Sequence, residues 1–229
     1  DNIVLNPWLY KKLTYDTFED FKPVGLVASS PSVFVVIPDS PFKTIDDVAR
    51  AASAKPGALT LGIPGVGGSG DLLGHQWRRA AKIELMHIPY RGWAQALPDL
   101  VSGRIDLYTG SVASLLPQIQ AGKVRALAVV ASERSPALPD VPTIGETFPG
   151  FENTIWIGLF APTGTPPAVV QRLREEVTKA LNAPDLIDSF QKAGGIEPLH
   201  TSLDEMQQMI KRDQTRYSKI IRELQLKVD

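Results

Sequence analysis

A glycine-rich segment contains the residues of this chain best suited to bind a charged ligand. It lies between an apolar run at 59–63 and a helical pattern, and consists of Gly65, Val66, Gly67, Gly68, Ser69 and Gly70. Glycine permits positive φ and lets a ligand approach the backbone amides closely. The first amides of the following helix lack an intrahelical acceptor, and the helix dipole adds partial positive charge there. With the Ser69 hydroxyl beside them, these amides predict a site for a carboxylate or a phosphate.

The same glycines also fit a dinucleotide-binding loop, because their spacing satisfies G-x-G-x-x-G at a strand-to-helix junction. That fingerprint expects an acidic residue roughly 20 positions later, where this chain has IPYRG at 88–92. Arg91 could still meet the 2′-phosphate of NADP, so an NADP-dependent enzyme remains an alternative, as does a purely structural turn. A Walker A loop is excluded, since no Lys-Ser or Lys-Thr pair follows the glycines.

A second cluster lies at the end of the next predicted strand and consists of Tyr90, Arg91, Gly92 and Trp93. Arg91 suits bidentate pairing with a carboxylate, unless it is a solvated loop arginine. Trp93 offers a flat apolar surface to a ligand, unless it packs on its own helix. Ser111 follows a later strand in the same way. Because ligands of open parallel sheets bind beyond the carboxyl ends of the strands, we expect these residues beside the glycine loop.

The histidines give no sign of a metal centre. The chain has three of them, His75, His87 and His200, and it has no cysteine. No H-E-x-x-H motif and no cluster with metal-ligand spacing is present, so the sequence predicts no metal site. His75 is interpreted as a surface or helix-packing residue, and His87 as a hydrogen-bonded residue of a strand. The absence of cysteine also excludes disulfides and thiolate nucleophiles.

Nothing in the sequence pairs a nucleophile with a base. Ser69 does not stand in a G-x-S-x-G elbow, and no base can be assigned to it. Asp71, in the first turn of the predicted helix, would complement the helix dipole but would also repel an anion bound there. We therefore expect capture and release of an unchanged anion, with no catalytic residue and no cofactor.

Composition indicates a globular chain with almost no net charge. Of 229 residues, 43% are hydrophobic, which is enough to form a core in one or two domains. A net charge of -1 predicts no nucleic-acid partner. No apolar run approaches the roughly 20 residues that span a bilayer, so we expect no direct membrane insertion. Residues 1–13 do not have the layout of a signal peptide.

Strand and helix patterns alternate over residues 24–130. Strands are expected from Val24 to Ile37 and at 59–63, 83–88, 105–109 and 124–130, with helices at 44–54, from Ser69, and at 94–102 and 111–121. The first of these helices begins with Thr44 and Asp47, a variant of the capping box. This alternation predicts a parallel sheet covered on both faces.

The C-terminal part follows a proline-rich segment at 134–149. A strand is expected at 155–161, and then a helix capped by Thr165. The apolar residues of that helix predict a stripe facing the core, made of Val169, Val170, Leu173, Val177 and Leu181. A capping box at Ser202 and Glu205 predicts a last helix that runs to about Leu224.

Many of these residues also belong to spaced motifs of one family. The motifs are Asn6-Pro7, Leu9-Tyr10, Tyr15-Asp16, Asp20-Phe21 with Pro23-Val24, the GVGGS loop, HIPYRG at 87–92, GKVRALA at 122–128, LPDVPT at 138–143 and APTGTP at 161–166. In these motifs the chain resembles the Bug receptors, the periplasmic solute-binding proteins of tripartite tricarboxylate transporters. Along the sequence, the resemblance extends from about Asn6 to the last predicted helix.

The resemblance implies an α/β, two-domain, periplasmic-binding-protein-like (type II) architecture, with parallel-rich sheets flanked by helices. Domain 1 would comprise 1–36 and 155–229, and domain 2, with the ligand loop, 37–154. The chain would cross between the domains near 33–38 and 155–161. The implied function is capture of a small organic anion, held by backbone amides and ordered water, for the subunits of a membrane transporter. A second alternative to this function, beside the NADP-dependent enzyme, is a shortened chain that binds no ligand and serves as an interaction or regulatory remnant.

Carried over to this sequence, the family's ligand loop falls on Gly65 to Ser69, with Tyr90 to Gly92 and Ser111 at its margins. Two differences from the family stand out. The family's strand, Pro-Phe-Pro-x-Gly-Gly loop and helix are absent before Asp1, so we expect an incomplete first domain with an exposed strand edge, through which a homodimer would form. Trp93 stands where the family usually has a small residue, which predicts a preference for aromatic or longer carboxylates.

Overall fold

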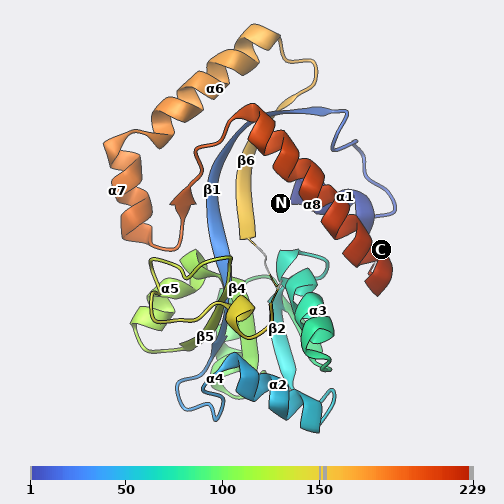
Figure 1. Cartoon of the computed structure of the whole chain (residues 1–229), viewed down its shortest axis with the longest axis vertical. Coiled ribbons are helices and arrows are strands. Elements are labelled where there is room, and N and C mark those ends of the chain that lie inside the picture. The colour runs from blue at the N-terminus through green and yellow to red at the C-terminus, as the bar shows by residue number, and fades with distance from the viewer. Residues whose placement is uncertain (1, 150, 152–153, 227–229) are drawn as a thin grey trace. The chain divides into compact units, whose positions relative to one another are not determined.

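The computed structural model describes residues 2–149, 151 and 154–226 (Figure 1). They form two compact units, one from the described residues of 1–29 and 156–229 and the other from those of 30–155. The sequence places the domain boundaries after residues 36 and 154, whereas the two units divide after residues 29 and 155. Residues 29 and 36 lie in the same strand, Phe21–Val36. Those boundaries stay a prediction.

The sheet of the second unit is mixed. Its strand order is β3-β2-β4-β1-β5, from β1 (Phe21–Val36), β2 (Thr60–Pro64), β3 (Met86–Tyr90), β4 (Leu107–Ser111) and β5 (Arg125–Val130). β2 runs parallel to both β3 and β4, as the alternation of strands and helices predicted. β1 runs antiparallel to β4 and to β5 and lies between them. The expected parallel sheet is therefore mixed, because β1, which spans both units, runs antiparallel to its neighbours.

Helices cover both faces of this sheet, as predicted (Figure 1). One core packs α2 (Ile45–Ala54) and α3 (Ser69–Ala81) on the sheet, and the other packs α4 (Trp93–Val101) and α5 (Val112–Gln120). Side chains of a strand alternate between its faces, so Phe34 and Val36 of β1 enter the first core while Val33 and Val35 enter the second. A short 3-10 helix, η1 (Ile144–Glu146), also packs on the first core.

The capping box at the start of α2 is confirmed. The Thr44 hydroxyl accepts from the Asp47 N–H at 3.1 Å, and the Asp47 carboxylate accepts from the Thr44 N–H at 2.8 Å. The N–H groups of Lys43 and Thr44 lower the pKa of Asp47 to about 2. These contacts hold the beginning of α2 at the residue that the sequence predicted.

The first unit contains four helices and three strands among its described residues. Its elements are α1 (Asn2–Leu9), part of β1, β6 (Thr154–Pro162), α6 (Pro167–Leu181), α7 (Pro184–Ala193), β7 (Glu197–Pro198) and α8 (Leu203–Leu224). Both β6 and β7 pair with β1, and α1 packs on α8 (Figure 1). The Trp156 indole N–H donates to the buried Asp213 carboxylate at 2.8 Å, which ties β6 to α8. The predicted capping box of α8, at Ser202 and Glu205, is confirmed.

Two expectations for α6 are wrong. Its N-cap is Pro166 rather than Thr165, and no side chain caps it. Of the predicted core stripe only Leu181 is buried, while Val169 is 47% exposed and Leu173 is 37% exposed. Helical spacing shows that apolar residues share a face, but here no described segment covers the beginning of that face.

No helix in the described ranges is both long enough and apolar enough to cross a membrane.

Candidate ligand-binding site

The glycine loop connects β2 to α3 by a turn that needs positive φ. Gly65 has φ +87° and Gly67 has φ +73°, while Gly68, in extended conformation, is the N-cap of α3. The Gly65 N–H donates to the Ile63 carbonyl at 3.0 Å, and the Gly67 N–H donates to the Asp71 carboxylate at 2.9 Å. Two amides of the loop are therefore already engaged within the protein.

Other amides of the loop and of the first turn of α3 have no acceptor among the described residues. The N–H groups of Val66, Gly68 and Gly70 make no hydrogen bond within the described part of the chain. Val66 is 53% exposed, so its side chain does not close the loop off from solvent. The partial positive charge of the helix N-terminus adds to these donors. N–H groups without an acceptor are the kind of donor that an anion needs, and the anion site stays a prediction.

Close packing of α3 on β2 depends on Gly70. A Cβ at this position would lie 2.6 Å from Cδ and 2.9 Å from Cγ of Pro64, the last residue of β2. Real Cβ atoms do not approach so closely, and a proline ring has little freedom to move. Gly70 therefore lets the first turn of α3 sit directly against the end of the strand.

The second predicted cluster lies at the same edge of the sheet, since Tyr90 of β3 pairs in parallel register with Pro64 of β2. The Tyr90 hydroxyl donates to the Asp99 carboxylate at 2.8 Å. Burial and this hydrogen bond raise the pKa of Tyr90 to about 12. The Arg91 side chain is exposed and forms no ion pair with any described residue. Gly92, with φ +148°, is the N-cap of α4.

Two more of the predicted residues lie at helix starts on this edge: Trp93 is the first residue of α4, and Ser111 is the N-cap of α5. Trp93 is partly buried, and its ring packs on Tyr108 with centroids 5.1 Å apart. The Ser111 hydroxyl, at the end of β4, accepts from the Ser114 N–H at 3.3 Å and caps α5. The parallel pairing of β2 with β3 and β4 thus brings together the ends of three strands that carry the predicted residues.

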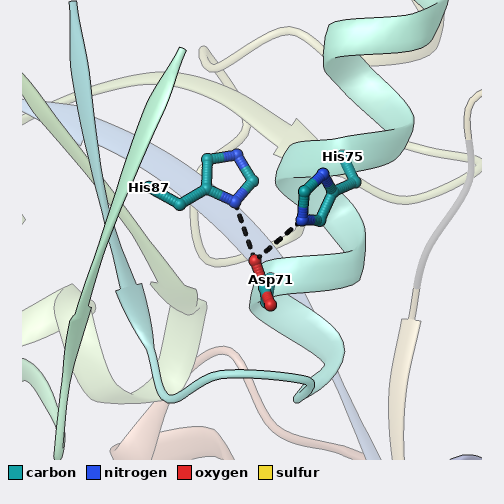
Figure 2. A group of neighbouring side chains, drawn as sticks. All are labelled: Asp71, His75 and His87. Carbon is teal, nitrogen blue, oxygen red and sulfur yellow. Dashed lines mark hydrogen bonds and ion pairs between the residues drawn. The ribbon is translucent and has the colours of Figure 1, made fainter. Parts of the chain in front are cut away.

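Asp71 has partners that sequence reasoning missed. Its Oδ1 atom lies 2.7 Å from Nδ1 of His87 and 3.4 Å from Nε2 of His75, and its Oδ2 atom accepts from the Gly67 N–H (Figure 2). Burial alone would raise the pKa of Asp71, but hydrogen bonds from His75, His87 and Gly67 outweigh it, so the pKa is well below its usual range. The carboxylate is thus ionised and surrounded by donors, which weakens the repulsion that we expected it to exert on an anion.

One signal in the sequence could have indicated this cluster. Asp71 and His75 are four residues apart, so they share a face of α3. His87 is on β3, and the β2–β3 pairing that brings it to α3 cannot be read from spacing along the chain. The interpretation of His87 as a hydrogen-bonded strand residue is confirmed, and His75, largely buried, packs within α3.

Comparisons of the sequence and of the structure with known proteins indicate the same family. Residues 1–226 match the sequence model of the tripartite tricarboxylate transporter family receptor. A Pseudomonas protein described as the UPF0065 protein in the tcbD-tcbE intergenic region is 40% identical over 226 residues, which are 98% of this chain and 67% of that protein. The chain thus spans about two thirds of the length of this curated relative.

Solved structures show the same fold. An R. palustris protein solved with adipate has a TM-score of 0.88 at 30% identity, over 96% of this chain and 74% of the other. The MatC protein of Rhodopseudomonas palustris, solved with bound malate, has a TM-score of 0.82 at 28% identity, over the same shares of the two chains. None of these comparisons points to an enzyme. The chain therefore belongs to the tripartite tricarboxylate transporter receptor family, as its resemblance to the Bug receptors predicted, and this is a family of solute-binding proteins.

Proposed function

We propose that this protein is a periplasmic receptor that captures a small carboxylate and delivers it to a tripartite tricarboxylate-type transporter. The observation that carries the proposal is the set of N–H groups at Val66, Gly68 and Gly70, at the start of α3 and without acceptors among the described residues. Adipate and malate, found with two similar proteins, are both small dicarboxylates. Such anions match the donors and the helix dipole at this loop.

The proposed site includes all residues that the sequence singled out. These are Gly65, Val66, Gly67, Gly68, Ser69, Tyr90, Arg91, Gly92, Trp93 and Ser111. In this proposal the loop amides bind one carboxylate group, and the Arg91 guanidinium supplies a positive charge nearby. The ligand is held by charge and hydrogen bonding and is released unchanged, since no step of the proposal breaks a covalent bond.

Titration calorimetry with matched charged and neutral ligands tests this function. We expect adipate or malate to bind one site per chain, because each presents a carboxylate to the loop amides. Adipamide, which has the length of adipate without its charge, should not bind. NADPH is the second control. Binding of NADPH with no response to either dicarboxylate would instead favour the NADP-dependent enzyme, the alternative left by the glycine spacing.

The homodimer is a separate proposal. It rests on the expected exposed strand edge of the first domain, and the exposed Val169 and Leu173 of α6 add an apolar surface in the same unit. Native mass spectrometry of freshly purified protein reports the oligomeric state and any retained ligand in one measurement. A monomer that binds carboxylate with full affinity would contradict the dimer and leave the receptor function intact.

Trp93 is expected to favour longer or aromatic carboxylates. We predict that Trp93→Ala weakens the binding of adipate and phthalate about tenfold, or about 1.4 kcal/mol, and leaves malate affinity nearly unchanged. The reason is loss of a flat apolar surface next to Arg91. Trp93→Phe, which keeps an aromatic ring on Tyr108, is the matched control and should retain most of the affinity. Equal adipate affinity in Trp93→Ala and the unmodified protein would mean that Trp93 serves packing alone.

A further inference from the structure

Asp71, His75 and His87 form a compact cluster of side chains that the proposed carboxylate site does not include. Asp71 and His75 lie one turn apart on α3, and His87 reaches them from β3 (Figure 2). One ligand atom from each residue, a carboxylate oxygen or an imidazole nitrogen, lies within 4.8 Å of the other two. Both imidazoles approach the same carboxylate oxygen, Oδ1 of Asp71.

The cluster is largely buried and its side chains are held in place. The exposed fractions of the side chains of Asp71, His75 and His87 are 5%, 17% and 11%. The Gly67 N–H binds Oδ2 of Asp71 and so fixes the carboxylate while leaving Oδ1 directed at the imidazoles. Gly74 makes room for His87, because a Cβ there would lie 2.7 Å from Cε1 of the ring. Such outer contacts are what orient the ligands of metal sites.

We infer that these three side chains form a binding site for a borderline divalent transition metal such as Zn²⁺. Two imidazole nitrogens and one carboxylate oxygen are a donor set typical of Zn²⁺, with a fourth position for water, and are unlike the all-oxygen sets of Ca²⁺ and Mg²⁺. A 2.7 Å separation between His87 and Asp71 is that of a hydrogen bond. The ion would take the place of the hydrogens that the imidazoles direct at Asp71, and each ring would then have its proton on its other nitrogen. Nδ1 of His87 would move away from Oδ1 of Asp71 to the spacing of two ligands of one ion.

Arg78 is the neighbouring group that opposes metal binding. Its guanidinium lies 3.3 Å from Nδ1 of His75 and also pairs with Glu84. A neutral histidine that binds a metal through Nε2 has its proton on Nδ1, which requires an acceptor at that position, whereas arginine offers only donors. We therefore expect Arg78→Gln, which removes a positive charge and supplies an amide oxygen, to bind the ion more tightly than the unmodified protein.

Cobalt spectroscopy and zinc calorimetry on the whole chain test the inference. After treatment with a chelator and its removal, the unmodified protein should bind one equivalent of Zn²⁺ near neutral pH. Co²⁺ should give the visible absorption of a four-coordinate site, because that band reports coordination geometry. His75→Gln and His87→Gln should each weaken Zn²⁺ binding by more than about tenfold. His200→Gln, at an exposed histidine outside the cluster, should leave it unchanged.

Several outcomes would overturn the inference. One is a chelator-treated protein that gives no four-coordinate Co²⁺ spectrum, a measurement that needs no variant and so does not depend on how the variants fold. Others are an equal Zn²⁺ affinity in His87→Gln and the unmodified protein, or a loss of binding in His200→Gln. None of these measurements involves a carboxylate ligand, so their failure would leave the receptor function standing.

Discussion

Trp77→Ala is expected to lower the free energy of unfolding by about 3–5 kcal/mol. Trp77 is fully buried on the inner face of α3, where its ring packs on Phe34 of β1 with centroids 4.9 Å apart. The substitution leaves a cavity between α3 and the sheet. The Trp77 indole N–H has no hydrogen-bond partner among the described atoms, so the loss is one of packing alone.

Chemical denaturation with urea measures this effect, and two variants serve as controls. Trp77→Phe should cost much less than Trp77→Ala, because it keeps most of the ring volume and removes a buried N–H without a partner. Trp93→Ala makes the same change in a partly exposed side chain and should also cost less. Equal denaturation midpoints for Trp77→Ala and Trp93→Ala would show that the interface between α3 and the sheet is not the main core of its unit.

Gly70→Ala is expected to weaken carboxylate binding by about tenfold or more and to destabilise the protein by about 1–3 kcal/mol. The added methyl group would overlap the ring of Pro64, so the first turn of α3 must move away from the end of β2. That movement displaces the N–H groups of Val66, Gly68 and Gly70 from one another, and an anion held by several amides depends on their mutual positions. Calorimetry with adipate reports the affinity, and thermal unfolding reports the stability.

Gly164→Ala is the matched control for this substitution. Gly164 has no atom within 4 Å of an added Cβ, and its φ is not in the left-handed region. The control should therefore retain both the affinity and the stability. Should Gly70→Ala also keep full adipate affinity, the start of α3 would not be where the carboxylate binds.

Local structure could be predicted wherever a few neighbouring residues determine it. Capping boxes at Thr44 and Ser202 place the starts of α2 and α8, and a strand, four glycines and a helical pattern predict the β2–α3 junction at the correct residues. In each case the contacts join groups within about one turn of each other along the chain. The short helices α1 and α7 were not predicted.

Structure that depends on distant segments could not be predicted in the same way. The run of β-branched residues at 33–37 predicts a buried strand but not its direction, and its antiparallel place between β4 and β5 follows from where the chain enters the sheet. Likewise, the spacing on α6 shows which residues share a face and not whether another segment covers that face.

The same distinction applies to the site. The glycine loop could be located from residue types alone, because all its amides belong to one short segment, 65–70. The partners of Asp71 come from different elements, and His87 reaches it only because β3 lies beside β2. A carboxylate that the sequence shows simply as a charge at a helix N-terminus is, in the folded protein, the centre of a hydrogen-bond network.

β1 has a consequence for biosynthesis. Val33 of β1 pairs with Gly110 on one side and with Val129 on the other, so both neighbours are translated long after β1 itself. Until then the VFVVI segment is an uncovered apolar strand in the nascent chain, of the kind that aggregates with other chains. Its pairing within the sheet is complete only once β5, the last strand of that sheet to be made, has been synthesised.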